Sequence, residues 1–169
     1  PISMKGRDRE YTAEVGEHIK KAFTKDNVVQ STNVAARVVF DALRLQNPGT
    51  DLMRLLRLGG EDDNFELRTI YRQTDVLLTE LRKLEGQGDI RLGGVVQTGR
   101  ADDVIANALR HFAIYHSTAA MLRRGDRLFI GDRSLLFYYQ NRLEGYDLGQ
   151  LHGLSPALAP CHRTLWGGR

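Results

Sequence analysis

The sequence predicts a mainly α-helical domain of about six helices with a small β-hairpin and winged-helix-like elements. Three observations lead to this fold class. Apolar residues recur every three or four positions along most of the 169 residues. Glycine, proline and acidic residues interrupt this periodicity where helices should end or begin. One stretch, TAAMLRRGDRLFIG at 118–131, alternates about a central turn instead.

The first two helices are predicted from their apolar faces. Tyr11, Val15 and Ile19 recur every four residues and place a helix over about 8–23. QSTNVAARVVFDALRLQ, residues 30–46, is the second helix. It is capped by Ser31 or Thr32 and stopped by Asn47-Pro48-Gly49. Its apolar face consists of Val34, Val38, Ala42 and Leu45.

Two further helices fill the middle of the chain. Thr50 is expected to cap a short helix that carries Leu52, Leu55 and Leu56 and ends at Gly59-Gly60. The acidic stretch EDDN at 61–64 supplies the negative charge that the helix dipole favours at the start of a long helix ending at Gly86. The core-facing side of that helix consists of Leu67, Ile70, Thr74, Leu77, Leu81 and Leu84.

The second half mixes irregular and regular segments. GDIRLGG at 88–94 is expected to be a short strand between glycines, and residues 95–101 a loop. Asp102 or Asp103 opens a fifth helix. A hairpin turns at Gly125-Asp126, and a last helix covers 134–146. The apolar side of the fifth helix consists of Val104, Ile105, Ala108, Leu109 and Phe112.

Composition limits the class of protein. Hydrophobic residues at 41% and charged residues at 27% are typical of a globular domain. The formal net charge of +3 is a mild basic bias, compatible with an acidic membrane surface or a phosphate-bearing partner. No apolar run approaches the ~18 residues of a membrane-spanning helix. The lone Cys161 excludes an intrachain disulfide.

No catalytic residue, metal site or cofactor is predicted. His111 and His116 are five positions apart, which places them on different helix faces rather than at the i, i+4 spacing of shared metal ligands. His152 and His162 fall in a tail broken by glycine and proline. The acidic pairs 62–63 and 102–103 stand where helices begin, so capping explains them.

One candidate surface is a nucleic-acid interface. LLTELRKLEGQGDIRL at 77–92 follows the pattern of a winged-helix recognition helix that runs into its wing. Arginines of the later hairpin would then approach phosphates: Arg123, Arg124, Arg127 and Arg133. The exposed face of the same helix mixes acidic with basic side chains, which argues against insertion into a major groove. Nucleic-acid binding therefore stays an alternative, beside a helical protein-interaction module.

The second candidate surface is the stretch SLLFYYQNRLEGYDL at 134–148. Its periodicity assigns Tyr139 to the inward face, with the leucines. Tyr138 and Arg142 are four apart on another face, where the ring can stack on the guanidinium. Asn141 can bond to the hairpin backbone. We expect a helix docked on the hairpin. The interface candidates are Tyr138, Asn141 and Arg142 of the helix and Arg123, Arg124 and Arg127 of the hairpin.

The order of these segments resembles the region after the catalytic domain in glycerol-3-phosphate acyltransferases of the large bacterial and mitochondrial type. PISMK resembles the chain from the proline of a Gly-Glu-Pro-like turn that ends the acyltransferase domain. STNVAARVVFDALRL, DLMRLLRL and YRQTDVLLTELRKL resemble the next helices. ADDVIANALRHF, AMLRRGDRLFIGD and a Tyr-Tyr-x-Asn segment, LLFYYQNRL, follow in the same order, so the resemblance covers about residues 1–147.

The resemblance implies a non-catalytic accessory region of an enzyme that acylates the sn-1 hydroxyl of glycerol 3-phosphate in phospholipid biosynthesis. The family's catalytic motif is His-x-x-x-x-Asp, and no histidine of this chain has an aspartate five positions later. Residues 1–7 would end the upstream acyltransferase domain, 8–147 would form the accessory domain, and 148–169 a loose tail. The chain is then expected to be part of a longer polypeptide.

The partners implied by the resemblance are that upstream domain and an anionic membrane surface on the cytoplasmic side, with neither a metal nor a nucleic acid. Relatives continue after the Tyr-Tyr-x-Asn segment in an apolar stretch that meets membrane. Here the polar and broken RLEGYDLGQLHGLSPALAP, residues 142–160, stands in its place. Contact of a peripheral kind is therefore expected rather than insertion of this end.

Overall fold

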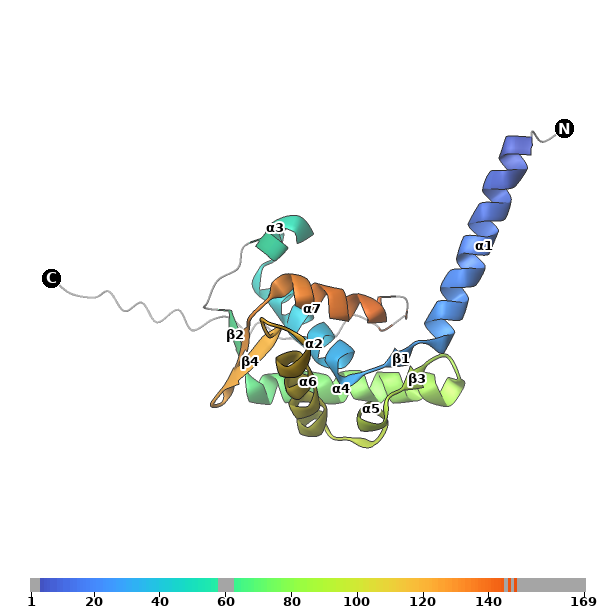
Figure 1. The fold of residues 1–169 in the computed structure, drawn as a ribbon. Coiled ribbons are helices and arrows are strands. Elements are labelled where there is room, and N and C mark those ends of the chain that lie inside the picture. Colours follow the sequence, from blue (N-terminus) through green and yellow to red (C-terminus); the bar gives the residue numbers. More distant parts are fainter. Residues whose placement is uncertain (1–3, 58–62, 145, 147, 149–169) are drawn as a thin grey trace.

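The computed structural model describes residues 4–57, 63–144, 146 and 148. It is mainly helical with a small antiparallel sheet, so the predicted fold class is confirmed (Figure 1). The helices are α1 (Met4–Asp26), α2 (Ser31–Gln46), α3 (Leu52–Arg57), α4 (Leu67–Gln87), α5 (Gly94–Thr98), α6 (Ala101–Tyr115) and α7 (Arg133–Gln140), followed by the 3-10 turn η1 (Asn141–Leu143). The strands are β1 (Val28–Val29), β2 (Asn64–Glu66), β3 (Arg91–Leu92), β4 (Met121–Arg124) and β5 (Arg127–Ile130).

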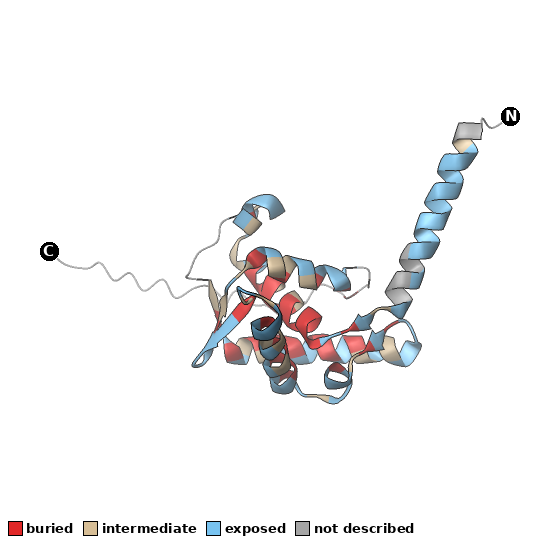
Figure 2. Ribbon diagram, viewed as in Figure 1, coloured by how far each residue is buried: buried red, intermediate tan, exposed pale blue. Residues whose placement is uncertain are grey.

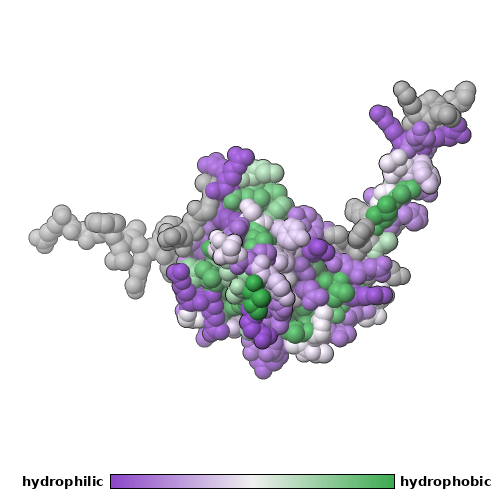
Figure 3. Space-filling model, in the orientation of Figure 1, coloured by the Kyte–Doolittle hydropathy of each residue, from purple (hydrophilic) through white to green (hydrophobic). Residues whose placement is uncertain are grey.

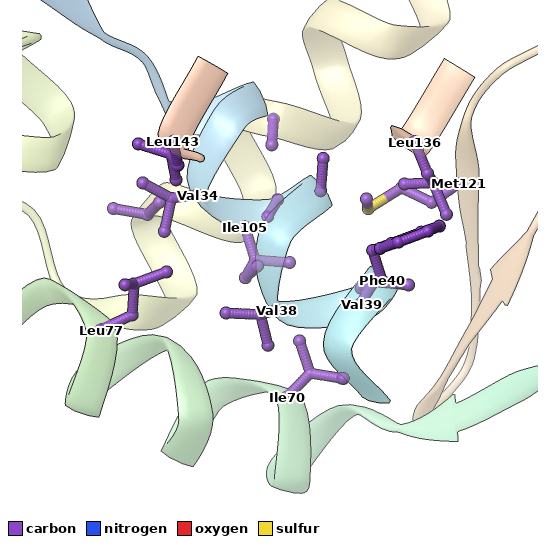
Figure 4. Packing of buried hydrophobic residues seen from close by; sticks show 14 of the residues in the cluster. Val34, Val38, Val39, Phe40, Ile70, Leu77, Ile105, Met121, Leu136 and Leu143 are labelled. Atoms are coloured by element: carbon purple, nitrogen blue, oxygen red, sulfur yellow. The ribbon is translucent and has the colours of Figure 1, made fainter. Parts of the chain in front are cut away.

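Helix α2 forms the centre of the packed body, and α4, α6 and α7 surround it (Figure 2). Eleven of its 16 residues are buried. Figure 4 shows Val38 between the side chains of Ile70 and Leu77 on α4, while Phe40 lies on the opposite side, toward α7 and β4. The ring of Phe40 packs at 5.5 Å from the ring of Phe137. A helix covered on several sides needs apolar residues around most of its circumference, not on one face alone.

The predicted hairpin is present, and it belongs to a sheet of three strands in the order β2-β5-β4. Gly125 in the turn has a φ of 63°, a conformation that favours glycine. Strand β2 was not predicted, because the acidic residues before it were expected to start a helix. Phe65 of β2 lies opposite Leu128 of β5, and both side chains are buried. Pairing with β5 therefore delays the start of α4 to Leu67.

Two other predictions for the middle of the chain are corrected. The strand after α4 is no wing: β3 pairs in parallel with β1, with Val29 beside Leu92. Residues 94–98, expected to lie mostly in a loop, form α5. The guanidinium of Arg82 on α4 donates to the carbonyl oxygen of Val96 at 3.1 Å and also to that of Gly99. These bonds satisfy carbonyl groups at the end of α5, which is why so short a helix persists.

Several helix ends also differ from the prediction. The carboxylate of Asp51, not Thr50, caps α3 by accepting from the backbone N–H of Arg54 at 2.9 Å. Helix α2 begins with a bond from the N–H of Gln30 to Asn33 Oδ1, while Ser31 donates instead to Asn107 of α6. Leu45, predicted on the apolar face of α2, is 51% exposed. The last helix ends at residue 140 rather than 146.

Helix α1 projects from the packed body (Figure 1). It has 23 residues and begins four positions earlier than predicted. The three side chains that predicted it remain in solvent: Tyr11 is 69%, Val15 36% and Ile19 50% exposed. Hydrophobic atoms along its side are visible in Figure 3. The periodicity thus predicted the helix correctly, but no surface of the described part of the chain covers its apolar face.

Candidate functional site

The hairpin arginines predicted as interface residues are exposed in the structure. The Nε of Arg123 donates to the carbonyl oxygen of Gly125 at 3.0 Å, and Arg127 donates to the side chain of Asn64. The guanidinium of Arg124 lies 5.2 Å from the ring centre of Phe129. None of the three forms an ion pair within the described part of the chain. Their charges are therefore available to a partner.

Arg133, the fourth arginine predicted to approach phosphates, is buried instead, at 7% exposure. Its guanidinium pairs with the carboxylate of Asp63 and donates to the carbonyl oxygen of Leu55. These contacts join the start of α7 to α3 and to the segment before β2. Arg133 is thus a structural residue, since a buried charge of this kind needs its partner to offset the loss of hydration.

Two more arginines lie near the hairpin, and no local sequence pattern predicts that position. The N–H of Leu67, the first residue of α4, donates to the carbonyl oxygen of Asp126 in the hairpin turn at 2.8 Å. The N-terminal end of α4 therefore adjoins the hairpin tip. Arg68 and Arg72, one turn apart near this end of α4, are exposed. Only the pairing of β2 with β5 brings them near the hairpin.

Tyr139 fastens α7 to α6. Its hydroxyl lies 2.8 Å from Nε2 of His116, and its ring meets the edge of Phe112 with the centres 5.0 Å apart. Its carbonyl oxygen accepts from the side chain of Asn33 on α2 at 3.1 Å. Burial, followed by the neighbouring Tyr138, raises the pKa of Tyr139, while Arg142 opposes the rise. The hydroxyl stays protonated at neutral pH and serves as a packing and hydrogen-bonding group.

The remaining members of the Tyr138–Arg142 segment lie at the surface. Tyr138 is 57% exposed and meets the ring of Tyr139 edge-on. Asn141 accepts from the side chain of Gln140 at 2.6 Å, so the predicted bond from Asn141 to the hairpin is wrong. Arg142 donates to the side chain of Asn27 at 3.4 Å instead of stacking on Tyr138. The segment is therefore the end of a helix that docks on α2, not on the hairpin as predicted, and its outer side chains face solvent.

The six predicted interface residues do not form one site. The hairpin lies before the N-terminal end of α7, and Tyr138, Asn141 and Arg142 lie at its C-terminal end (Figure 1). A helix of eight residues separates the two groups by about 12 Å along its axis. The structure thus presents two separate polar surfaces.

An open groove lies between α5 and α6. Its volume is about 360 Å³, and it is lined by Val95, Thr98, Gly99, Asp103, Ala106, Asn107 and Arg110. Asp103 and Asn107 already have partners, since Asp103 accepts from the N–H of Arg100 and Asn107 accepts from Ser31. The polar groups of this groove are thus largely engaged in holding the start of α6.

Metal and membrane-spanning features were sought over the described ranges. No cluster of three or more His, Cys, Asp or Glu side chains that could hold a metal ion occurs there. No helix in these ranges combines the length and the apolar character needed to cross a bilayer. Cys161, His152 and His162 lie outside the described residues, as does the tail predicted from residue 148 except Leu148 itself, which is buried.

Comparison with known proteins returned no match: no family model, no curated protein and no solved structure is similar to this chain.

Proposed function

We propose that this chain is the non-catalytic C-terminal accessory region of a glycerol-3-phosphate 1-O-acyltransferase, an enzyme that transfers a fatty acyl group to the sn-1 hydroxyl of glycerol 3-phosphate in phospholipid biosynthesis. The observation that carries the proposal is the ordered series of segments that ends in Tyr138-Tyr139-Gln140-Asn141. The module packs against the acyltransferase domain and helps to hold that domain at the membrane surface.

The geometry of the Tyr-Tyr-x-Asn segment supports a structural role for this marker. Tyr139 bonds to His116, the residue directly after α6, and its backbone carbonyl oxygen accepts from Asn33 of α2. The segment therefore joins three helices of the packed body. A structural role of this kind is sufficient to explain why the Tyr-Tyr-x-Asn motif marks the family, and it requires no catalytic role for the motif.

The exposed face of α1 supports docking on a partner domain. Tyr11, Val15 and Ile19 lie at i, i+4 and i+8, so they share one face of the helix, and no part of the packed body covers them. Burial of such side chains contributes about 1.5–3 kcal/mol each when it is complete. The occupant that we assign to this face is the acyltransferase domain, because the resemblance places the end of that domain at residues 1–7, where α1 begins.

Acyl-transfer assays on the longer polypeptide test the proposal. The gene upstream of Pro1 should encode a domain with a His-x-x-x-x-Asp motif, and the longer protein should acylate glycerol 3-phosphate with an acyl thioester of coenzyme A or of acyl carrier protein. The present chain alone should show no such activity. Acylation by the chain alone would contradict a non-catalytic role, and an upstream region without an acyltransferase motif would contradict the whole proposal.

The role of α1 is tested by co-purification of the acyltransferase domain with this chain as separate polypeptides. The variant Tyr11→Ser/Val15→Ser/Ile19→Ser should bind the domain at least about tenfold more weakly, since a factor of ten corresponds to only about 1.4 kcal/mol. The matched control is Val76→Ser/Ile114→Ser/Tyr115→Ser, which removes three exposed apolar side chains from α4 and α6. Equal losses in the two variants would mean that α1 is not the docking face.

A further inference from the structure

The hairpin tip and the N-terminal end of α4 lie together at one end of the packed body (Figure 1), and these elements carry five exposed arginines. We call this the basic end; its arginines are Arg68, Arg72, Arg123, Arg124 and Arg127. Two contacts fix the arrangement: Glu66 lies opposite Arg127 across β2 and β5, and Leu67 donates to the hairpin turn. The start of α4 and the hairpin tip, almost sixty positions apart in the sequence, are thus adjacent.

Charge is unevenly distributed between this end and the rest of the chain. The exposed carboxylates of the basic end are Glu66, Asp75 and Asp126, which leaves a surplus of two positive charges. The whole chain carries only +3. None of the five arginines forms an ion pair within the described residues. A concentrated and internally unpaired surplus of this kind attracts a polyanionic surface.

Apolar side chains accompany these cations on the outer face of the hairpin. Leu122 lies directly opposite Phe129, and Arg124 lies opposite Arg127. Alternate residues of a strand share a face, so these four side chains form one patch, which we call the hairpin face. Leu122 is 41% exposed and Phe129 is half-buried beneath the guanidinium of Arg124. Apolar side chains flanked by arginines match the boundary between lipid headgroups and acyl chains.

We propose that the hairpin face and the neighbouring arginines of α4 bind the surface of a bilayer that contains anionic phospholipids. The arginines contact lipid phosphates, while Leu122 and the edge of Phe129 enter the headgroup region. This inference rests on the proposed function, which places the chain beside an enzyme of phospholipid synthesis. It goes further by identifying which surface of the chain meets the membrane. Tyr138, Asn141 and Arg142 lie toward the other end of α7 and take no part.

The other polyanion that this surface could meet is nucleic acid, and the charges of α6 argue against it. In a winged-helix arrangement the helix before the hairpin would approach the duplex. Helix α6 begins with the exposed side chains of Asp102 and Asp103, which would repel the phosphates. An exposed leucine between arginines also has no partner on a phosphate backbone, whereas a lipid headgroup layer accommodates it.

Co-sedimentation of the full chain with lipid vesicles tests this inference. At low salt the chain should bind vesicles of phosphatidylcholine mixed with phosphatidylglycerol, and should not bind vesicles of phosphatidylcholine alone. The variant Arg68→Ser/Arg72→Ser/Arg124→Ser should lower the partition coefficient at least about tenfold, because each basic residue near an anionic surface is worth about a factor of five. Among the residues that the structure describes, none of these three side chains makes a hydrogen bond or an ion pair.

The matched control is Arg54→Ser/Arg91→Ser/Arg110→Ser, which removes the same charge from exposed arginines outside the basic end. It should retain most of the binding. Leu122→Ser should weaken binding to the mixed vesicles and leave the thermal midpoint unchanged. Equal losses in both arginine variants, or no binding to mixed vesicles, would overturn the inference.

Duplex DNA in place of vesicles separates the two polyanions. Binding to DNA that depends on Arg68, Arg72 and Arg124, without binding to vesicles, would assign the basic end to nucleic acid and overturn the lipid assignment. The acyltransferase test above does not depend on this result, because a chain that fails to bind vesicles can still bind the acyltransferase domain. Failure of the inference and failure of the proposed function are thus distinguishable.

Discussion

Helices α1 and α2 carry apolar residues at the same spacing, and yet they have opposite environments. In α1 the side chains at 11, 15 and 19 lie in solvent, whereas in α2 those at 34, 38 and 42 have no exposed surface. The difference lies in what flanks them: α4, α6 and α7 surround α2, and α1 projects away (Figure 2). Periodicity therefore identifies the face of a helix that a protein buries, and tertiary structure determines whether the covering surface belongs to the same chain.

Truncation of apolar side chains should produce the largest difference in stability between variants of α1 and variants of α2. Phe40→Ala on α2 removes a ring that packs on Phe137 in the core, so it should lower the free energy of unfolding by about 3–5 kcal/mol. Val15→Ala on α1 should change it by less than about 0.5 kcal/mol. Urea unfolding followed by circular dichroism measures both. A comparable loss for Val15→Ala would mean that α1 packs on the body.

The second comparison lies within one turn at the end of α7. Tyr139→Ala should lower the free energy of unfolding by about 2–3 kcal/mol, because it removes the ring that packs on Phe112 and the hydroxyl that bonds to His116. Arg142→Ala, three residues on and exposed, should leave it within about 0.5 kcal/mol. Thermal melts of both variants distinguish packing from surface residues. Equal losses of melting temperature would contradict this division.

Glycines extend the comparison to the backbone. A Cβ on Gly131 would lie 2.1 Å from the carbonyl oxygen of Ala119, whereas one on Gly16 in α1 would meet nothing within 4 Å. Gly131→Ala should therefore destabilise the fold by about 1–3 kcal/mol. Gly16→Ala should raise helix content without loss of stability, since alanine favours a helix interior by about 1 kcal/mol over glycine. Circular dichroism at 222 nm and urea unfolding report the two effects, and destabilisation by Gly16→Ala would show an unexpected close contact.

Alkaline pH should produce the smallest effect. Burial raises the pKa of Tyr139 above the ordinary 10.0, so the folded state holds the phenolic proton more tightly than the unfolded state. The resulting stability is fully present below about pH 10 and is lost as the pH rises through the folded pKa. The urea midpoint of the wild type should fall more between about pH 9 and pH 11 than that of Tyr139→Phe. Tyr11→Phe on the exposed helix α1 serves as the control. If the urea midpoint of Tyr139→Phe falls with pH as steeply as that of the wild type, the pH dependence comes from another group. Tyr146 is such a group, because burial also raises its pKa.

Long periodic elements were predictable, and short ones were not. The helices that became α2, α4 and α6 each have an apolar face, so the local pattern was sufficient to predict them, although the cap of α2 and the start of α4 were predicted wrongly. Strand β2 and helix α5 have three and five residues, too few for a period. Strand β2 forms because β5 supplies its hydrogen-bonding partners. Helix α5 forms because Arg82 donates hydrogen bonds to carbonyl groups at its end. These partners are distant in the sequence.

The candidate surfaces show the same limit. Exposure of Arg123, Arg124 and Arg127 followed from their place around a predicted turn, and the inward ring of Tyr139 followed from helix spacing. The packing partners of these residues could not be predicted from the sequence. His116 as the partner of Tyr139, and Arg68 and Arg72 beside the hairpin, depend on how α6 and α4 pack, which no local pattern specifies.

The sequence by itself determined the helical class, the position of the hairpin and the amphipathic faces, because backbone propensity and apolar spacing act over a few residues. Only the tertiary structure decided which apolar faces are covered, that Arg133 is buried while its neighbours are exposed, and that arginines from α4 and the hairpin share one end. Those outcomes depend on contacts between residues about sixty to eighty positions apart, where packing and hydrogen bonding choose among surfaces that look alike in sequence.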